Sequence, residues 1–70
     1  DMYGSTMTVL EQLYHNLEIG GYLILDDWLI SGARQALLDF RERLGIKEAL
    51  YEDFSGVFWK KTMATAAPGK

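Results

Sequence analysis

The feature that most constrains the fold of this chain is a short apolar run, Tyr22–Leu25, which stands between two glycines and two aspartates. Gly20 and Gly21 precede the run, and Asp26 and Asp27 follow it. An unbroken apolar run of this length, bounded by turn residues, is typical of a strand that is covered on both faces in an α/β sheet. Ligands of such sheets collect at the carboxyl ends of the strands. The two aspartates are therefore candidate functional residues.

The residues before this strand predict a helix over Ser5–Leu17. Apolar side chains recur there at the spacing of one helical face, at Leu10, Leu13, Tyr14 and Leu17. Ser5 or Thr6 is a plausible N-cap, and Thr8 with Glu11 also matches a capping box. Gly20 and Gly21 are expected to end the helix, because glycine adopts the left-handed conformation of a helix terminus at little cost.

The residues after the strand predict a second helix and then a hairpin. Ser31 can cap the helix, Gly45 can end it, and one apolar stripe runs along it: Ala33, Ala36, Leu37, Phe40 and Leu44. A strand is expected around Ala49–Asp53, and Ser55-Gly56 is a tight-turn signal before the β-prone residues 57–59. The predicted order is α-β-α-β-β, which is an α/β fold.

Length and composition bound the possible functions. Seventy residues make one small domain, here a module over residues 1–61 with a flexible tail over 62–70. The net charge of −3 and the scattered bases argue against a nucleic-acid partner. Without cysteine, thiolate metal sites and disulfides are excluded. The absence of cysteine fits a cytoplasmic origin. No apolar run is long enough for a membrane span, so a soluble protein is expected.

Four stretches, in order and at matching spacing, resemble the C-terminal part of the macrocin O-methyltransferase family. They are Asp1-Met2-Tyr3-Gly4-Ser5-Thr6, residues 20–27, Asp39-Phe40-Arg41 with Gly45-Ile46, and Gly56-Val57-Phe58-Trp59-Lys60. The resemblance covers about sixty residues. It implies the last part of a class I methyltransferase fold, with a three-stranded mixed sheet in which the last strand is inserted, antiparallel, between the other two.

The resemblance also implies a metal and a cofactor. Family members transfer a methyl group from S-adenosylmethionine to a sugar hydroxyl, with a bound Mg²⁺ that orients and acidifies that hydroxyl. Position by position, Asp26 and Asp27 match an aspartate pair that binds the metal, and carboxylate oxygens are the hard ligands that Mg²⁺ prefers. By the resemblance, a third ligand, which in the family also serves as the general base, belongs two positions before Asp1. Trp28 is a candidate for contact with the substrate, and no catalytic residue is assigned within the chain.

Nothing in the chain resembles the glycine-rich turn with which class I methyltransferases bind their cofactor, so the sequence leaves open whether it is an enzyme. We expect a C-terminal fragment of a methyltransferase, inactive alone and binding neither S-adenosylmethionine nor Mg²⁺ by itself. The alternative is an independent binding or assembly module that keeps the fold without the chemistry. With two further strands available, one edge of the first strand should be bare, or paired with a second copy or a missing N-terminal half.

The remaining polar residues have simpler interpretations. His15 is expected on the solvated side of the first helix, and Phe58 and Trp59 in edge and core packing. Lys60 and Lys61 are expected to be solvated. The arginines of the second helix are expected to form a solvated face with local pairs to Asp39 and Glu42: Arg34, Arg41 and Arg43.

Overall fold

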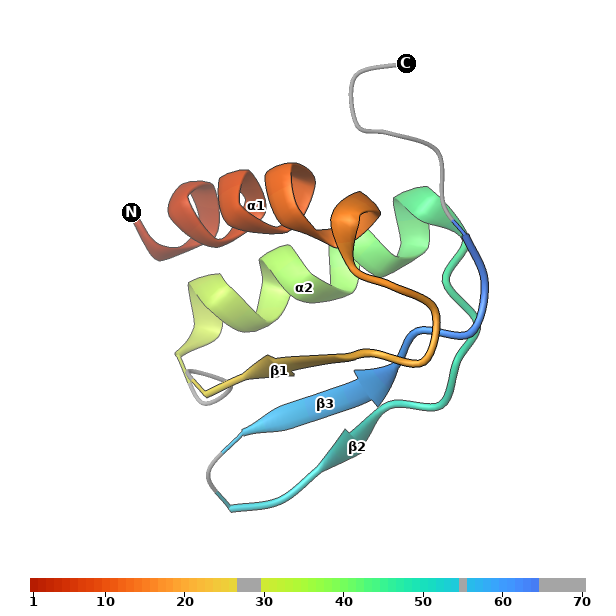
Figure 1. Cartoon of the computed structure of the whole chain (residues 1–70). Helices are drawn as coiled ribbons and strands as arrows, with labels where there is room; N and C mark the ends of the chain where they lie inside the picture. Colours follow the sequence, from red (N-terminus) through yellow and green to blue (C-terminus); the bar gives the residue numbers. More distant parts are fainter. Residues whose placement is uncertain (27–29, 55, 65–70) are drawn as a thin grey trace.

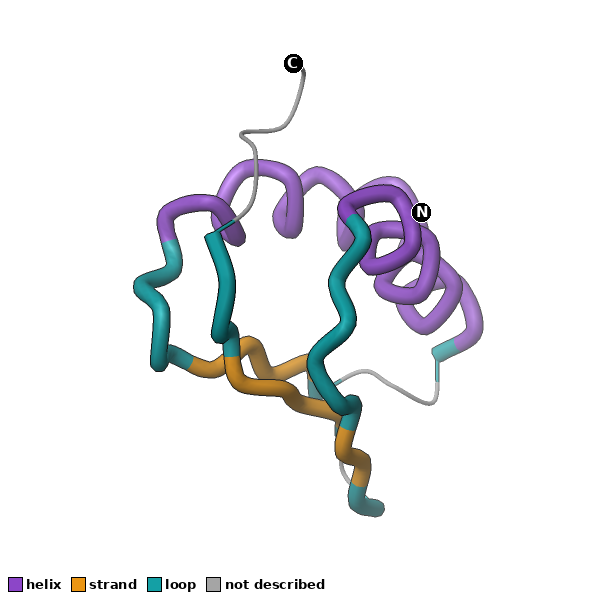
Figure 2. Tube along the Cα trace, turned by 90° about the vertical axis from the view of Figure 1, so that its right-hand side faces the viewer, coloured by secondary structure: helices purple, strands orange, loops and turns teal. Residues whose placement is uncertain are grey.

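Two helices cover one face of a three-stranded sheet in the computed structural model of this chain (Figures 1 and 2), which describes residues 1–26, 30–54 and 56–64. The helices are α1 (Met2–Leu13), followed by a 3-10 turn η1 (Tyr14–Asn16), and α2 (Ser31–Leu44). The strands are β1 (Tyr22–Leu25), β2 (Tyr51–Glu52) and β3 (Val57–Lys60). The predicted element order is confirmed.

The sheet has the order β1-β3-β2, and both ladders are antiparallel. The strand β3 therefore lies between the other two, as the family resemblance implies. The outer strands β1 and β2 run in the same direction, and β3 runs opposite to both. The sheet therefore contains parallel strands, as expected of a mixed sheet, but they are not neighbours. The predicted hairpin is confirmed by the β2–β3 pairing of Tyr51 with Phe58 and of Glu52 with Val57.

The helix α1 begins earlier than the sequence predicts. Asp1 is its N-cap, since the Asp1 carboxylate accepts a 2.6 Å hydrogen bond from the backbone N–H of Gly4. The prediction of Ser5 or Thr6 as the cap was wrong, because Asp1 already satisfies a first-turn donor. The regular helix also ends at Leu13, before the expected Leu17, and the chain reverses at Gly20, whose φ of 97° favours glycine.

The helix α2 matches its prediction closely. It ends where Gly45 adopts a left-handed φ of 67° and its N–H bonds back to carbonyls of the last turn. Most of the predicted apolar stripe is fully buried, at Ala33, Ala36, Leu37 and Phe40. Ser31 is the first helical residue rather than the cap, which is Ile30 and makes no side-chain hydrogen bond.

The core lies between the helices and the inner face of the sheet, and aromatic side chains dominate it. The rings of Tyr14 and Phe40 meet edge to face with centroids 5.5 Å apart, and Tyr14 also packs against Trp59 at 5.7 Å. The guanidinium of Arg41 lies 4.6 Å from the centre of a Trp59 ring. The expected solvated position of Arg41 was therefore wrong, while the core position of Trp59 is confirmed.

Lys61 is buried, with only 2% of its surface exposed, so its expected solvation was also wrong. Its ammonium group donates to the carbonyls of Tyr14 at 2.8 Å and Leu17 at 2.7 Å. Tyr14 is the C-cap of α1 and Leu17 is the C-cap of η1, so both carbonyls lie at helix ends, where their partial negative charge attracts a cation. Lys61 thus ties the end of the first helical segment to the end of β3.

The face of the sheet that points away from the helices is apolar and exposed. Tyr22 and Ile24 of β1 are 55% and 68% exposed, which contradicts the prediction that this strand is covered on both faces. Tyr22, Phe58 and Tyr51 form a row of neighbouring aromatic rings across the three strands. The strand is therefore covered by α1 and α2 on one face only within the described residues.

Candidate functional site

One end of the molecule gathers the carboxyl end of β1, the first residues of both helices and the turn between β2 and β3 (Figure 1). Asp26 lies at this end, directly after Leu25, and is exposed to solvent. Its neighbours Asp27 and Trp28 lie outside the described residues. The structure therefore places the first predicted metal ligand at a strand end, where the sequence analysis expected it.

The β2–β3 turn packs tightly against this strand end. An added Cβ on the buried Gly56 would lie 2.4 Å from the carbonyl oxygen of Leu25 and 3.1 Å from the Cα of Asp26. The turn is closed by Asp53, whose carboxylate accepts a 3.0 Å hydrogen bond from the Gly56 N–H and whose own N–H donates to the Gly56 carbonyl at 2.9 Å. Only glycine allows the turn to fix the position of Asp26 in this way.

The first turn of α1 meets the first turn of α2 at the same end. A Cβ on Gly32 would lie 3.1 Å from the backbone nitrogen of Tyr3 and 3.3 Å from the side chain of Met2. Asp1 is held here as well, because its carboxylate caps α1 and its carbonyl accepts a 2.9 Å hydrogen bond from the Ser5 hydroxyl. The capping role engages one carboxylate oxygen of Asp1 in a hydrogen bond.

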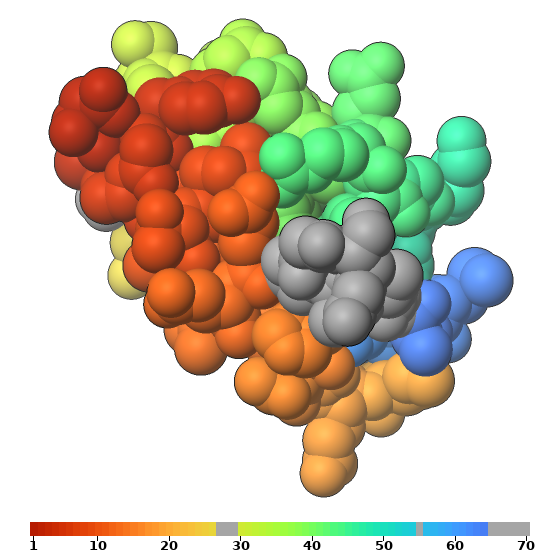
Figure 3. Space-filling model, turned by 90° about the horizontal axis from the view of Figure 1, so that it is seen from above, coloured from red at the N-terminus to blue at the C-terminus, as the bar shows by residue number. Residues whose placement is uncertain are grey.

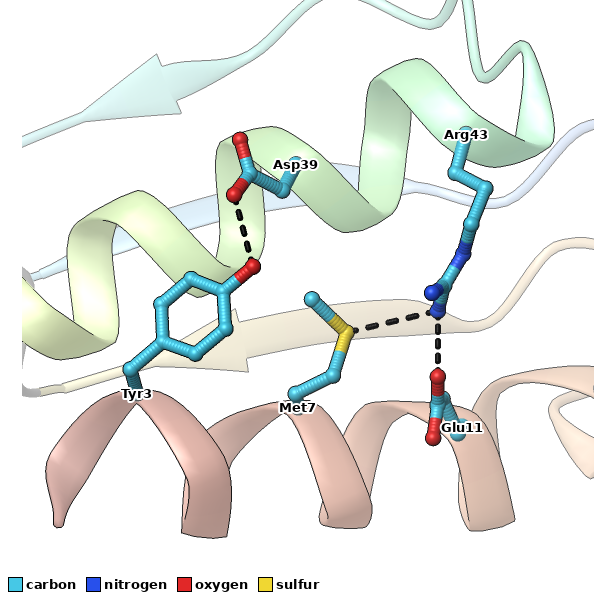
Figure 4. Close-up of polar contacts among 5 residues, drawn as sticks. All are labelled: Tyr3, Met7, Glu11, Asp39 and Arg43. Carbon is cyan, nitrogen blue, oxygen red and sulfur yellow. Dashed lines mark hydrogen bonds and ion pairs between the residues drawn. The ribbon is translucent and has the colours of Figure 1, made fainter.

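Polar side chains join the two helices along their outer side (Figure 4). The Tyr3 hydroxyl donates to Asp39 at 2.7 Å, and Arg43 contacts both the Glu11 carboxylate and the sulfur of Met7. The hydrogen bond with Tyr3 lowers the pKa of Asp39, and the same bond raises the pKa of Tyr3.

These contacts correct a prediction about the second helix. Asp39 and Arg43 bond to α1 rather than to each other, although Asp39 also accepts a local hydrogen bond from Gln35. Seen from the helix side, α1 in red and orange lies against α2 in green (Figure 3). The polar contacts therefore join α1 to α2.

The described part of the strand end offers one ligand of the kind that Mg²⁺ prefers. Asp26 offers the hard oxygen that Mg²⁺ prefers, and its exposure leaves it accessible. Among residues 1–26, 30–54 and 56–64, however, no group of three or more histidine, cysteine, aspartate or glutamate side chains could hold a metal ion. The described part of the chain therefore lacks a self-contained metal site, and His15 is exposed, as predicted.

A groove of about 470 Å³ runs between α1 and the outer edge of β1. Its lining is mostly apolar, and Leu13, which was expected on the buried face of the helix, is 59% exposed there. The strand contributes residues 22–25, and α1 contributes Met2, Val9 and Leu10 among others. Sequence periodicity alone did not reveal this groove. The periodicity shows which side of α1 is apolar, but not which part of that side is covered by the rest of the chain.

Comparison with known proteins identifies relatives of the whole arrangement. The family described as Macrocin-O-methyltransferase (TylF) matches residues 1–61. The 8-demethyl-8-(2,3-dimethoxy-alpha-L-rhamnosyl)-tetracenomycin-C 4'-O-methyltransferase of Streptomyces olivaceus is 45% identical over 67 residues, which are 94% of this chain and 26% of that protein. The mycinamicin III 3''-O-methyltransferase of Micromonospora griseorubida is 41% identical over 63 residues, 89% of this chain and 25% of the relative.

A solved structure agrees with the sequence matches. The O-methyltransferase NovP superimposes with a TM-score of 0.83 and 34% identity, over 90% of this chain and 27% of NovP. The chain thus spans about a quarter of the length of the relatives that it matches. None of the described helices is both long enough and apolar enough to cross a membrane.

Proposed function

The chain belongs to the macrocin O-methyltransferase family, and we propose that it forms the C-terminal part of a magnesium-dependent enzyme that methylates a sugar hydroxyl with S-adenosylmethionine. The relatives are named as O-methyltransferases, and the name of one of them includes a rhamnosyl compound. The likeness to NovP shows that the chain has part of a methyltransferase fold. A methyl donor and an acceptor hydroxyl follow from membership of such a family.

The observation that carries the proposal is the position of Asp26 within this fold. The carboxylate stands at the carboxyl end of β1, exposed and held in place by the close approach of Gly56. Ligands of α/β sheets bind at this end. Asp26 and Asp27 would hold Mg²⁺ together with oxygen ligands from further chain, and Trp28 would border the acceptor. When bound, the metal supplies a positive charge that orients the acceptor hydroxyl and lowers its pKa.

The chain alone is proposed to be inactive. It spans about a quarter of the length of its relatives, and its described residues contain no group of three or more histidine, cysteine, aspartate or glutamate side chains that could hold a metal ion. Calorimetric titration of the purified chain with S-adenosylmethionine, and separately with Mg²⁺, should detect no binding. Tight binding of S-adenosylmethionine would contradict this part of the proposal.

A chimera tests the catalytic role. In this chimera the chain replaces its matching quarter of the mycinamicin III 3''-O-methyltransferase, and methylation of mycinamicin III is followed in the presence of Mg²⁺. We expect turnover by the chimera and a loss of about 100-fold or more on Asp26→Asn, because the neutral amide is a weaker metal ligand. The matched control is Glu42→Gln, an exposed side chain on α2. A folded chimera in which both variants retain full activity would rule out a metal role for Asp26.

The alternative function is an assembly module without catalysis. Its support is the bare outer edge of β1 in the described part of the chain, since an open strand edge favours association. Light scattering after size-exclusion chromatography distinguishes the two proposals. A stable homodimer whose size does not change when Mg²⁺ is added would favour the module, whereas a monomer would favour the methyltransferase fragment.

A further inference from the structure

The β2–β3 turn presents a phenylalanine whose ring lies almost wholly in solvent. Phe54 is 95% exposed, whereas Ile24, the next most exposed large apolar side chain in the described ranges, is 68% exposed. Single exposed apolar side chains are common on protein surfaces, so exposure by itself assigns no role to Phe54. The backbone around this residue supplies the further evidence.

Hydrogen bonds hold the backbone on both sides of Phe54. The N–H of Asp53 donates to the carbonyl of Gly56 at 2.9 Å, and the N–H of Gly56 donates to the Asp53 carboxylate at 3.0 Å. The two residues that flank the tip of the turn are thereby joined to each other. Phe54 therefore stands on a backbone that is fixed before a ligand binds, which lowers the entropic cost of binding.

The same turn is fixed to the strand end that carries Asp26. A Cβ on Gly56 would lie 3.1 Å from the Cα of Asp26, so the two backbones are in contact. Because consecutive Cα atoms are about 3.8 Å apart, the Cα of Phe54 lies within about 8 Å of that of Gly56. Phe54 and the exposed Asp26 thus belong to one end of the sheet (Figure 1), the end at which α/β sheets bind ligands.

We propose that Phe54 contacts the acceptor, with its ring packed against apolar surface of that molecule next to the hydroxyl that receives the methyl group. The inference rests on the proposed function, which places this hydroxyl beside Asp26. Small-molecule sites combine aromatic and apolar side chains with a few polar groups that fix the orientation of the ligand. Asp26 supplies a polar group of this site, and Phe54 supplies an apolar wall that determines affinity.

Further chain of the longer relatives is the alternative cover for the ring, and it fits the position less well. The turn that carries Phe54 packs directly beside Asp26, whose carboxylate is exposed. A segment of protein that buried the ring would approach this carboxylate as well, and it would take space that the metal and the acceptor need. An acceptor molecule contacts both side chains without that conflict.

Acceptor affinity tests the proposal in the chimera with the mycinamicin III enzyme. Calorimetric titration with mycinamicin III should give a Kd about tenfold higher for Phe54→Ala, because most of the apolar contact is lost. Phe54→Tyr keeps the ring and should bind nearly as well as the original chimera. The matched control is Ile19→Ala, since Ile19 is 62% exposed and precedes β1, at the opposite end of that strand. Equal Kd values for Phe54→Ala and Ile19→Ala would overturn the proposal.

Steady-state kinetics distinguish the role of Phe54 from that of Asp26. A ring that contacts the acceptor equally in the ground state and the transition state affects KM, so Phe54→Ala should raise KM about tenfold and leave kcat nearly unchanged. Asp26→Asn should lower kcat. A loss of kcat at constant KM in Phe54→Ala would contradict the proposed contact.

A fluorinated ring reports the contact directly and without turnover. Phe54 is replaced in the chimera by a fluorinated phenylalanine, and its ¹⁹F NMR signal is followed during titration with mycinamicin III. The signal should shift in proportion to the bound fraction. A signal that stays in place when the chimera is saturated would mean that further chain covers the ring, or that the acceptor lies elsewhere, and the proposal would be wrong.

The outcomes separate this proposal from the proposed function. A chimera that binds mycinamicin III more weakly with Phe54→Ala, but transfers no methyl group, would support the contact and contradict the catalytic role. A chimera whose activity depends on Asp26 but whose acceptor affinity is the same with Phe54→Ala would overturn the contact alone.

Discussion

The indole N–H of Trp59 donates a 2.8 Å hydrogen bond to the hydroxyl of Tyr14, in the centre of the core. The two residues are almost completely buried and 45 positions apart in the sequence. Burial raises the pKa of Tyr14, so the hydroxyl remains a neutral acceptor over the ordinary pH range. Both polar atoms of the pair are thereby satisfied, and β3 is fixed against the end of the first helical segment.

Tyr14→Phe should destabilise the fold by about 1–3 kcal/mol, because the buried indole N–H of Trp59 loses its acceptor. The free energy of unfolding from urea titration measures the effect. Tyr51→Phe is the matched control, since Tyr51 is exposed on the outer face of the sheet and should change stability little. Equal losses for the two variants would mean that the hydrogen bond contributes nothing specific.

Lys61→Met should cost about 1–3 kcal/mol, because it removes the ammonium group that bonds the carbonyls of Tyr14 and Leu17. Methionine keeps much of the apolar side chain, so the loss is that of the polar contacts. The neighbouring Lys60 is exposed, and Lys60→Met serves as the control in the same urea titration. A variant at position 61 that is as stable as the original chain would show that this burial is energetically neutral.

Gly56→Ala should displace the carboxyl end of β1. Its Cβ would lie 2.4 Å from the Leu25 carbonyl oxygen, and the backbone must move at a cost of about 1–3 kcal/mol. Backbone amide NMR signals of Leu25 and Asp26 should shift. Gly45→Ala is the control, because a Cβ there meets nothing within 4 Å and only the positive φ is strained. Unchanged signals at Leu25 and Asp26 in Gly56→Ala would contradict the close approach.

Acid should release the contact between Glu48 and Thr62. The Glu48 carboxylate accepts hydrogen bonds from the Thr62 N–H at 2.8 Å and from its hydroxyl at 2.9 Å. The backbone hydrogen bond from Thr62 is the main cause that lowers the pKa of Glu48 in the folded chain. The resulting stabilisation is present above the pKa of an unfolded glutamate, about 4.3, and is lost as the pH falls through the lower, folded value.

Glu48→Gln isolates this contribution. The variant should be less stable than the original chain at pH 7, and the difference in the free energy of unfolding should shrink as the pH falls below the folded pKa of Glu48. Glu42→Gln, at an exposed position, should show no such trend. A difference that stays constant with pH would mean that the ionised carboxylate is not what Thr62 recognises.

Local sequence signals predicted the elements well where one residue decides the geometry. Gly45 ends α2 as expected, and Gly56 lies in the turn between β2 and β3, while Ser55 lies outside the described residues. The position of Asp26 at the end of β1 followed from the apolar run before it. The roles of Asp26, Asp27 and Trp28 remain predictions, and the latter two lie outside the described residues.

The errors concern charged residues and burial, which depend on contacts between distant segments. Lys61 was assigned to solvent because of its charge, although strict alternation from Val57 through Trp59 places it on the inner face. Arg41 was assigned to a solvated face because its partner Trp59 is far away in the sequence. The composition of β1 predicted cover on both faces, but the described residues supply cover for only one.

The hydrogen bonds of Tyr14 with Trp59 and Lys61 also determine when this part of the chain can fold during synthesis. The residues that hold the end of the first helical segment are synthesised 45 and 47 positions after Tyr14. At ordinary rates of translation this is a delay of a few seconds. A free helix as short as α1 is marginal in water. This part of a nascent chain therefore gains its core only when β3 has emerged, and a ribosome that stalls before Trp59 would leave α1 and η1 without the contacts that hold them.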